Sequence, residues 1–301
     1  MMKIGAIVIL YNPNQESINH AISILRPQTD IICLIDNSLS SHEHWFSNQP
    51  NLHYIPLHQN VGIAAAQNIG IDYLMKNDYD YDYALLSDQD SVAEKDTVDK
   101  LMESLTALEK NNYRVAAVGT TPFNKKTNKP YPQKSKVIKH IQGKEIGLGS
   151  HLTECYSMIS SMSLIPIRNF RLIGLFDESL FIDGVDHEWC WRAWHKAKLR
   201  SFLVDEAYLH HQLGEGDKKI GSRDISIASP FRVYYQFRNY LWLCRRDYTP
   251  KYWKKRHLLK YAVKMFYFPI CVAPRMEYAK NIFKGIADGL FKYDKTTLPV
   301  I

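Results

Sequence analysis

The stretch YALLSDQDS at residues 83–91 joins a short apolar run directly to two acids. The apolar half predicts a buried strand that ends at Asp88. Asp88 and Asp90 are spaced i and i+2, and an extended backbone would place their side chains on the same side. Paired carboxylates at the end of a strand can hold a hard divalent cation, which in turn can bind a diphosphate. The alternative is an ordinary turn, because Asp and Ser are common in turns.

The chain on either side of this stretch alternates between strand and helix patterns. Residues 3–10, 30–36, 52–57 and 115–119 favour strands, and residues 15–25, 63–75 and 94–108 have the apolar spacing of helices. This order predicts an α/β fold with right-handed crossovers and a mainly parallel sheet. Ligands of such sheets bind beyond the carboxyl ends of the strands, where we expect both Asp36 and Asp88.

The first predicted strand is not followed by a glycine-rich phosphate motif. Neither Gly-x-Gly-x-x-Gly nor a Walker loop occurs there, which argues against a dinucleotide dehydrogenase and a P-loop enzyme. The charge of a bound diphosphate would then have to be met by a metal ion, for which Asp88 and Asp90 are candidates. Asp36 is expected either to accept a hydrogen bond from a base or ribose, or to cap a helix.

Charge and cysteine content limit the possible partners. Residues 230–301 carry 15 Lys and Arg against four acids, a net charge of +11. The whole chain has a net charge of +7, so residues 1–229 have a net charge of −4. The five cysteines are scattered, which predicts reduced thiols in a cytoplasmic protein and not a disulfide framework or a zinc site. No stretch approaches the roughly 18–20 apolar residues that span a bilayer.

A second group of acids lies in GLFDESLFIDGVDHEWCWR, residues 174–192. The spacing of Val185 and Trp189 predicts a helix that begins near Asp183 or Asp186. Acids are favourable at the N-terminus of any helix, so this pattern has a purely structural interpretation. Acids beside packed tryptophans also suit a general base.

Four segments together resemble the nucleotide-sugar domain of family 2 inverting glycosyltransferases, in particular their bacterial rhamnosyltransferase branch: IVILYNP (7–13), LIDNS (34–38), NVGIAAAQNIG (60–70) and SDQDS (87–91). The resemblance covers residues 3–92 well. It implies a GT-A fold, Rossmann-like with helices on both faces of the sheet. It also implies a nucleotide-diphosphate-sugar donor and Mg²⁺ or Mn²⁺.

The resemblance also implies roles for individual residues. Asp36 would contact the base, Asp88 the ribose or the metal, and Asp90 the metal. Four further positions would complete the donor site: Asn12, Asn60, Gly62 and Asn68. The alternative for residues 60–70 is a capped helix whose small residues pack on the sheet.

The acids of residues 183–188 are similar to the family's acidic pair before a helix containing Trp-Cys-x-Arg. Val185-Asp186 replaces the usual Glu-Asp here, so Asp186 is matched as the general base and Asp183 is its main rival. Asp183, Glu188 and Trp189 are expected to shape the acceptor pocket.

Family members also carry a His-x-x-Gly that can complete the metal shell, and His211 fits this register with Gly214. A histidine with a structural role is the alternative. His210 would point the opposite way on a strand.

Residues 229–293 combine aromatic and basic side chains at helical spacing. This composition predicts helices that lie on an anionic membrane surface. Helices that pack on the catalytic domain and a nucleic-acid partner are the alternatives, but no nucleic-acid-binding motif is present. The resemblance extends through Arg232-x-x-Tyr235 and Arg238-Asn239 and then fades.

Residues 121–150 look irregular and would form a lid or a surface loop.

We therefore expect a GT-A catalytic domain at 1–228, with a nucleotide-sugar half at 1–120 and an acceptor half at 150–228, followed by a basic helical segment at 229–301. The expected enzyme transfers a sugar, above all L-rhamnose from dTDP-rhamnose, to a glycan on a polyprenyl diphosphate carrier. It would act in bacterial O-antigen (lipopolysaccharide) or other surface polysaccharide biosynthesis, on the inner face of the cell membrane. The alternatives are a glucosyl- or galactosyltransferase using a UDP-sugar, and a non-catalytic membrane- or nucleic-acid-binding module.

Overall fold

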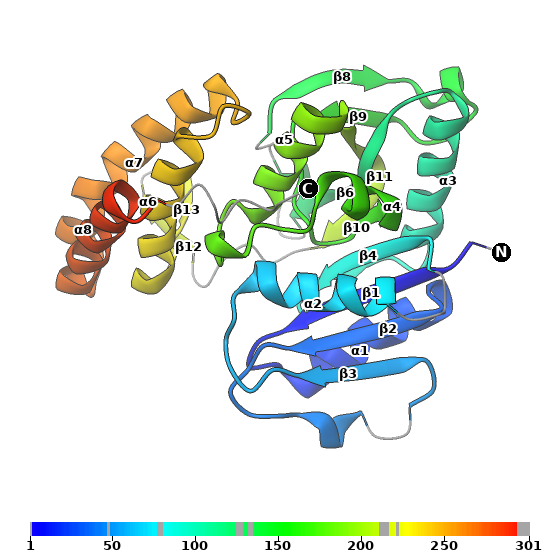
Figure 1. Cartoon of the computed structure of the whole chain (residues 1–301), viewed down its shortest axis with the longest axis horizontal. Helices are drawn as coiled ribbons and strands as arrows, with labels where there is room; N and C mark the ends of the chain where they lie inside the picture. Colours follow the sequence, from blue (N-terminus) through cyan, green and yellow to red (C-terminus); the bar gives the residue numbers. More distant parts are fainter. Residues whose placement is uncertain are drawn as a thin grey trace.

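The structure is a computed structural model that describes residues 2–46, 49–76, 81–124, 129–131, 135–210, 217–220 and 223–293. Its centre is a sheet of 11 strands whose main path has the order β3-β2-β1-β4-β10-β6-β11-β9-β8 (Figure 1). The strands of this sheet are β1 (Ile4–Leu10), β2 (Ile31–Asp36), β3 (Leu52–Pro56), β4 (Tyr83–Asp88), β5 (Val92–Ala93), β6 (Val115–Asn124), β7 (Lys129–Pro130), β8 (Val137–Ile141), β9 (Leu152–Cys155), β10 (Ser163–Pro166) and β11 (Arg200–His210). A separate hairpin pairs β12 (Asp217–Ile220) with β13 (Arg223–Ser226).

Helices cover both faces of the sheet, as the pattern predicts. The helices are α1 (Gln15–Leu25), α2 (Ile63–Lys76), α3 (Thr97–Lys110), α4 (Ile167–Ile173), α5 (Val185–Ala197), α6 (Pro230–Cys244), α7 (Lys251–Cys271) and α8 (Arg275–Phe291). Alternate residues of β1 enter two different cores: Ile7 packs with residues of α2, α4 and α5, and Val8 packs with residues of α1 and α3. A strand buried on both sides in this way is expected to be apolar throughout, which is why IGAIVIL forms β1.

The parallel half of the sheet is the one that the sequence predicts. β1 runs parallel to β2 and β4, and β2 runs parallel to β3. The register pairs Leu10 with Asp36 and Ile9 with Asp88, so both acids lie at the same carboxyl edge. The predicted shared location of Asp36 and Asp88 is therefore confirmed.

The second half of the sheet differs from the prediction in two places. The residue pattern predicts two short strands at 200–204 and 207–211, but β11 is continuous to His210, with an irregularity in its pairing between Val204 and Tyr208. Residues 121–150 are not wholly irregular, because Val137–Ile141 pairs antiparallel with β9. Antiparallel pairing along an edge needs no sustained apolar run, and this is why the pattern did not reveal β8.

The three C-terminal helices lie side by side at one end of the molecule (Figure 1). They share a small core that includes Val233 of α6, Phe268 of α7 and Ile282 of α8. Gly285 allows α8 to lie close to α6, because a Cβ at this position would be 2.5 Å from the carbonyl oxygen of Tyr234. Among the helices that the structure describes, none is both long enough and apolar enough to cross a bilayer.

Helix α6 also belongs to the core of the catalytic sheet. Its residues Tyr240 and Leu243 are buried in the same apolar cluster as Trp189 of α5. The predicted boundary between residues 228 and 229 falls just before this helix. The boundary remains a prediction, and the packing shows that α6 joins the two parts.

A cluster of buried charges ties α5 to the end of α6. The guanidinium of Arg246 is hydrogen-bonded to Asp177 and lies 3.2 Å from Glu188. Glu188 also accepts hydrogen bonds from Arg192 at 2.9 Å and from the hydroxyl of Tyr248 at 2.6 Å. All four charged residues are buried. Burial would raise the pKa of Glu188, but Arg192, Arg246 and Tyr248 hold this pKa below its ordinary value.

Replacing Arg246 should strongly destabilise the fold. In Arg246→Met the carboxylates of Asp177 and Glu188 remain buried with one cation fewer, and breaking such a cluster typically costs about 3–5 kcal/mol. Urea unfolding followed by tryptophan fluorescence measures the loss. The exposed Arg275→Met is the matched control and should unfold like the wild type. Equal unfolding midpoints for the two variants would contradict the prediction.

Candidate active site

The Asp-Gln-Asp stretch forms a turn at the end of β4. The strand ends at Asp88, and the N–H of Ser91 donates to the carbonyl of Asp88 at 3.1 Å. Of the two arrangements that the sequence left open, the structure has the turn and not an extended backbone over 88–90. Asp88 is half-buried and Asp90 is exposed at the sheet edge. A turn replaces the strand because Gln89 is bonded to the loop after β1. Its side chain accepts from the N–H of Tyr11 at 2.8 Å and donates to the carbonyl of Tyr11 at 3.1 Å.

The loops after β2 and β3 are joined by two asparagines. Asn37 donates to the side-chain oxygen of Asn60 at 3.1 Å and accepts from the N–H of Val61 at 2.8 Å. Asn60 also accepts from the N–H of Gly62 at 3.0 Å, so it shapes the turn that leads into α2. Only the fold brings Asn37 opposite Asn60. A donor contact by Asn60 remains a prediction.

Gly62 allows the loop before α5 to approach the start of α2. Its φ is +86°, and a Cβ would lie 2.7 Å from the carbonyl oxygen of Phe181. That oxygen accepts from the N–H of Ile63 at 2.8 Å. The structure therefore gives Gly62 a packing role, and its predicted contact with the donor remains untested.

Asp36 is enclosed by the loop that follows β2. Its carboxylate accepts from the hydroxyl of Tyr54 at 2.5 Å and from the N–H of Ser38 at 3.1 Å, and it lies 2.7 Å from Nδ1 of His42. Burial would raise the pKa of Asp36, but these hydrogen bonds hold it below its ordinary value. Asn12 lies nearby, because its N–H donates to the hydroxyl of Ser38 at 2.8 Å. The base contact of Asp36 and the donor contact of Asn12 remain predictions.

Asn68 is a positioning residue in the structure, and its predicted contact with the donor remains a prediction. Its amide donates to the carbonyl of Phe176 and to the carboxylate of Glu178, both at 2.9 Å, and it accepts from the N–H of Phe176 at 2.9 Å. The residue is buried, and both amide hydrogens and the amide oxygen are hydrogen-bonded within the protein. Asn68 therefore fixes the loop that leads to the second group of acids.

Acids from the two halves of the domain act electrostatically on one guanidinium, that of Arg232 in α6. Arg232 makes a bidentate pair with Asp183, at 2.8 and 3.0 Å. This hydrogen-bonded pair, together with the charges of Asp186 and Asp88, raises the pKa of Arg232. A charge on β4 and two charges next to α5 are thus within electrostatic reach of the same group. The fold brings together Asp88, Asp183 and Asp186, which the sequence proposed from two separate stretches.

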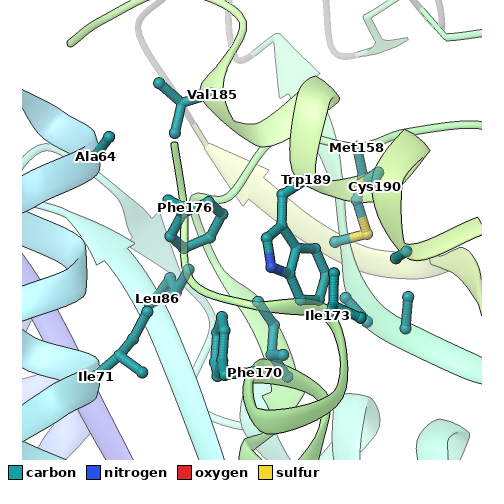
Figure 2. Packing of buried hydrophobic residues seen from close by; sticks show 14 of the residues in the cluster. Ala64, Ile71, Leu86, Met158, Phe170, Ile173, Phe176, Val185, Trp189 and Cys190 are labelled. Carbon is teal, nitrogen blue, oxygen red and sulfur yellow. The ribbon is translucent and has the colours of Figure 1, made fainter. Parts of the chain in front are cut away.

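Two predicted acceptor-pocket residues are instead buried in the protein interior. Glu188 is fully buried in the charge cluster described above. Trp189 packs against the rings of Phe170 and Phe176 (Figure 2). Its indole N–H donates to the carbonyl of Gly174 at 3.0 Å. Helical periodicity explains the error, because the side of α5 that carries Glu188 and Trp189 faces the core. Asp183 and Asp186 are partly exposed, so the acceptor role predicted for Asp183 remains open to test.

Only part of the predicted metal site can be placed. Asp88 and Asp90 lie at the edge of β4, but His211 falls outside the described residues. Within the described ranges, no three His, Cys, Asp or Glu side chains gather as a set of metal ligands. Two carboxylates fit Mg²⁺, which commonly binds through one or two carboxylates together with substrate phosphates and water.

Comparison with known proteins identifies the family. The model of the family described as glycosyl transferase family 2 matches residues 6–167, which is more than half of the chain. This protein belongs to glycosyl transferase family 2. It is therefore a glycosyltransferase, and the family that the sequence motifs indicated is confirmed.

One curated relative extends over nearly the whole of this glycosyltransferase. The chain is 28% identical over 294 residues to the dTDP-rhamnosyl transferase RfbF of Shigella flexneri, and the alignment covers 95% of both chains. The relative therefore includes a counterpart of the C-terminal helices as well as of the sheet.

Solved structures confirm the GT-A fold. The crystal structure of GalNAc-T7 with UDP, GalNAc and Mn²⁺ has a TM-score of 0.56 at 14% identity; the match covers 99% of this chain but only 58% of that chain. The crystal structure of S. aureus TarS 1-349 in complex with UDP-GlcNAc has a TM-score of 0.54 at 14% identity, covering 98% and 83%. Identities this low establish the shared fold alone.

Removing the amide of Asn68 should destabilise the glycosyltransferase. Asn68→Ala removes three hydrogen bonds and leaves both the N–H and the carbonyl of Phe176 without these partners, which should cost about 2–4 kcal/mol. Chemical unfolding measures this cost. Asn281→Ala is the matched control, because Asn281 makes only an exposed hydrogen bond within α8. A change of less than about 0.5 kcal/mol in Asn68→Ala would show that the amide does not hold the loop.

Proposed function

We propose that this glycosyltransferase moves L-rhamnose from dTDP-rhamnose, with inversion, to a glycan carried on a polyprenyl diphosphate in surface polysaccharide assembly. The observation that carries the proposal is the contact of Arg232 with Asp183, together with the electrostatic influence of both Asp186 and Asp88 on the same guanidinium. These acids come from both the donor half and the acceptor half. The full-length similarity to the dTDP-rhamnosyl transferase of Shigella flexneri supports the choice of sugar and nucleotide.

Asp186 is the better candidate for the general base. Both carboxylate oxygens of Asp183 already accept hydrogen bonds from Arg232, one from Nε and one from a terminal nitrogen, so Asp183 is committed to this pair. Asp186 lies three residues further on, in the first turn of α5, and accepts a short-range hydrogen bond from the N–H of His187 at 2.7 Å. Asp183 would then act with Arg232 to hold the acceptor side of the site in place.

The reaction follows from these positions. The acceptor hydroxyl gives its proton to Asp186, and its oxygen forms a bond to the anomeric carbon from the face opposite the nucleotide. The bond between that carbon and the diphosphate oxygen breaks, and the diphosphate leaves with the bonding electrons. A positioned carboxylate lowers the barrier because it accepts the proton while the new bond forms.

Asp88 and Asp90 would hold the divalent ion, Mg²⁺ or Mn²⁺. When bound, the ion offsets the negative charge that builds up on the leaving diphosphate. The crystal structure of GalNAc-T7, which has the same fold, contains UDP and Mn²⁺, and this supports a divalent ion in the proposed reaction. Gln89 contributes indirectly by fixing the turn between the two acids to the loop after β1.

Neutral replacement of the two rival acids should separate their roles. Asp186→Asn should lower kcat by at least about 100-fold, because a general base typically contributes 10²–10⁴-fold. Asp183→Asn should lower kcat less and raise the KM for the acceptor, since it weakens a positioning pair. Steady-state kinetics with labelled donor measures both. Asp72→Asn on the exposed face of α2 is the control and should have wild-type kinetics. If kcat stays near the wild-type value in Asp186→Asn and falls strongly in Asp183→Asn, Asp183 and not Asp186 is the general base.

Donor and metal requirements test the rest of the proposal. A set of dTDP- and UDP-sugars, each assayed with and without Mg²⁺ or Mn²⁺, should give the highest turnover with dTDP-rhamnose and little turnover after EDTA treatment. Asp88→Ala should lose both donor binding and the response to metal. Turnover confined to a UDP-sugar would disprove the rhamnose donor but keep the enzyme class. Full activity in EDTA would disprove the metal role of Asp88 and Asp90.

A further inference from the structure

One face of α7 carries two exposed cations followed by a row of exposed apolar side chains. Residues spaced three or four apart share this face, and we call it the basic-apolar face. It consists of Lys255, Arg256, Leu259, Val263, Phe266 and Ile270. The four apolar side chains are 59–71% exposed. Exposed apolar residues scattered singly are normal, but a continuous stripe over three turns of one helix is not.

The charge of α7 restricts what can cover this stripe. The helix contains six Lys and Arg residues and no Asp or Glu. A protein that buries the stripe would have to bring acids next to Lys255 and Arg256, and a second copy would bring none on its own α7. An anionic bilayer supplies both requirements, because its headgroups attract the cations and its acyl chains accept the apolar side chains.

We propose that the basic-apolar face of α7 docks on an anionic membrane surface, with the helix lying in the plane of the headgroups. No transmembrane insertion is involved, in keeping with the finding that none of the described helices can span a bilayer. The proposal deepens the proposed function, because it explains how the enzyme meets an acceptor carried on a lipid. It depends on that function only for its biological purpose, and not for the binding itself.

The opposite side of α7 faces the acids of the candidate site. Nζ of Lys264 donates to the side chain of Gln236 at 2.7 Å, and the Gln236 amide lies 3.5 Å from the carboxylate of Asp183. Burial and the neighbouring Lys260 lower the pKa of Lys264 to about 7, while Asp183 opposes this shift. A single helix thus separates the proposed membrane surface from the acceptor side of the site. A glycan whose carrier lies in the bilayer would therefore have to extend only past α7 to arrive at the acceptor side of the site.

Co-sedimentation of the full chain with vesicles tests the proposal. The probes are vesicles of phosphatidylcholine alone and of phosphatidylcholine mixed with phosphatidylglycerol. We expect binding to the mixed vesicles only. Lys255→Gln with Arg256→Gln should weaken it about 30-fold, at about 1 kcal/mol for each cation. Leu259→Ser with Phe266→Ser should weaken it by at least about tenfold, because both apolar side chains are lost from the interface.

Matched controls come from other surfaces. Leu39→Ser removes a side chain that is 75% exposed, and Lys139→Gln removes an exposed cation on β8; neither should change vesicle binding. Vesicle binding that is equal in all variants would overturn the proposal. A second result would also overturn it: the wild type sediments as a dimer that does not bind vesicles, and Leu259→Ser/Phe266→Ser converts this dimer to a monomer. The basic-apolar face would then be an interface between copies of the chain.

Transfer to a water-soluble acceptor separates this proposal from the proposed function. The α7 variants should keep wild-type turnover with a soluble glycan, because none of the substituted side chains lies in the catalytic group. If transfer fails for the wild type as well, the proposed reaction is wrong and the vesicle result still decides the membrane surface. If transfer works and vesicle binding is absent, only the membrane surface is disproved.

Discussion

The loop between α4 and α5 depends on hydrogen bonds from distant helices, and the rest of the site depends on this loop. Asn239 of α6 donates to the carbonyls of Leu180, Ile182 and Asp183, at 2.8–3.0 Å. From the other side, Asn68 of α2 binds Phe176 through both its N–H and its carbonyl. Irregular backbone cannot satisfy its own polar groups, so a partly buried loop must obtain partners elsewhere. The positions of Asp183 and Asp186 follow from where those partners lie.

This dependence makes the C-terminal helices part of the glycosyltransferase site. Arg238 and Asn239 hold the loop, Arg232 pairs with Asp183, and Arg246 completes the charge cluster under α5. The basic segment was expected to serve a membrane, and its abundant cations were the reason. The structure shows that several of these cations are instead used inside the protein. The cations left on the outer face of α7 are the ones that support the proposed membrane surface.

The two kinds of acid in this protein differ in how their charge is met. Glu188 and Asp177 lie in the interior, where an unpaired carboxylate is strongly unfavourable, and each is paired with a buried arginine. Asp183 and Asp186 lie at the edge, partly open to solvent, beside a single guanidinium. The first arrangement stabilises the helix pair, and the second leaves carboxylates that can act on a ligand. Glu188 therefore has a different role from Asp183 and Asp186, although it lies only five and two positions from them in the sequence.

The sequence by itself determined the parallel half of the sheet, the edge shared by Asp36 and Asp88, and the family. These features depend on local periodicity and on short motifs, so they can be read without knowing any long-range contact. It also gave Asp88, Asp90, Asp183 and Asp186 as the acids of interest. It could not separate Glu188 and Trp189 from these acids, because the side of α5 that faces the core is fixed only by packing.

Tertiary structure alone decided the roles of Asn68, Gln89, Arg232 and Asn239. Each of these side chains binds a partner far away in the sequence: Asn68 is 108 residues from Phe176, and Arg232 is 49 residues from Asp183. No sequence pattern identifies the hydrogen-bond partner of a side-chain amide or guanidinium. That partner depends on how the helices pack and on which loop carbonyls need donors. The acids were therefore predictable from the chain, and the residues that hold them in place were not.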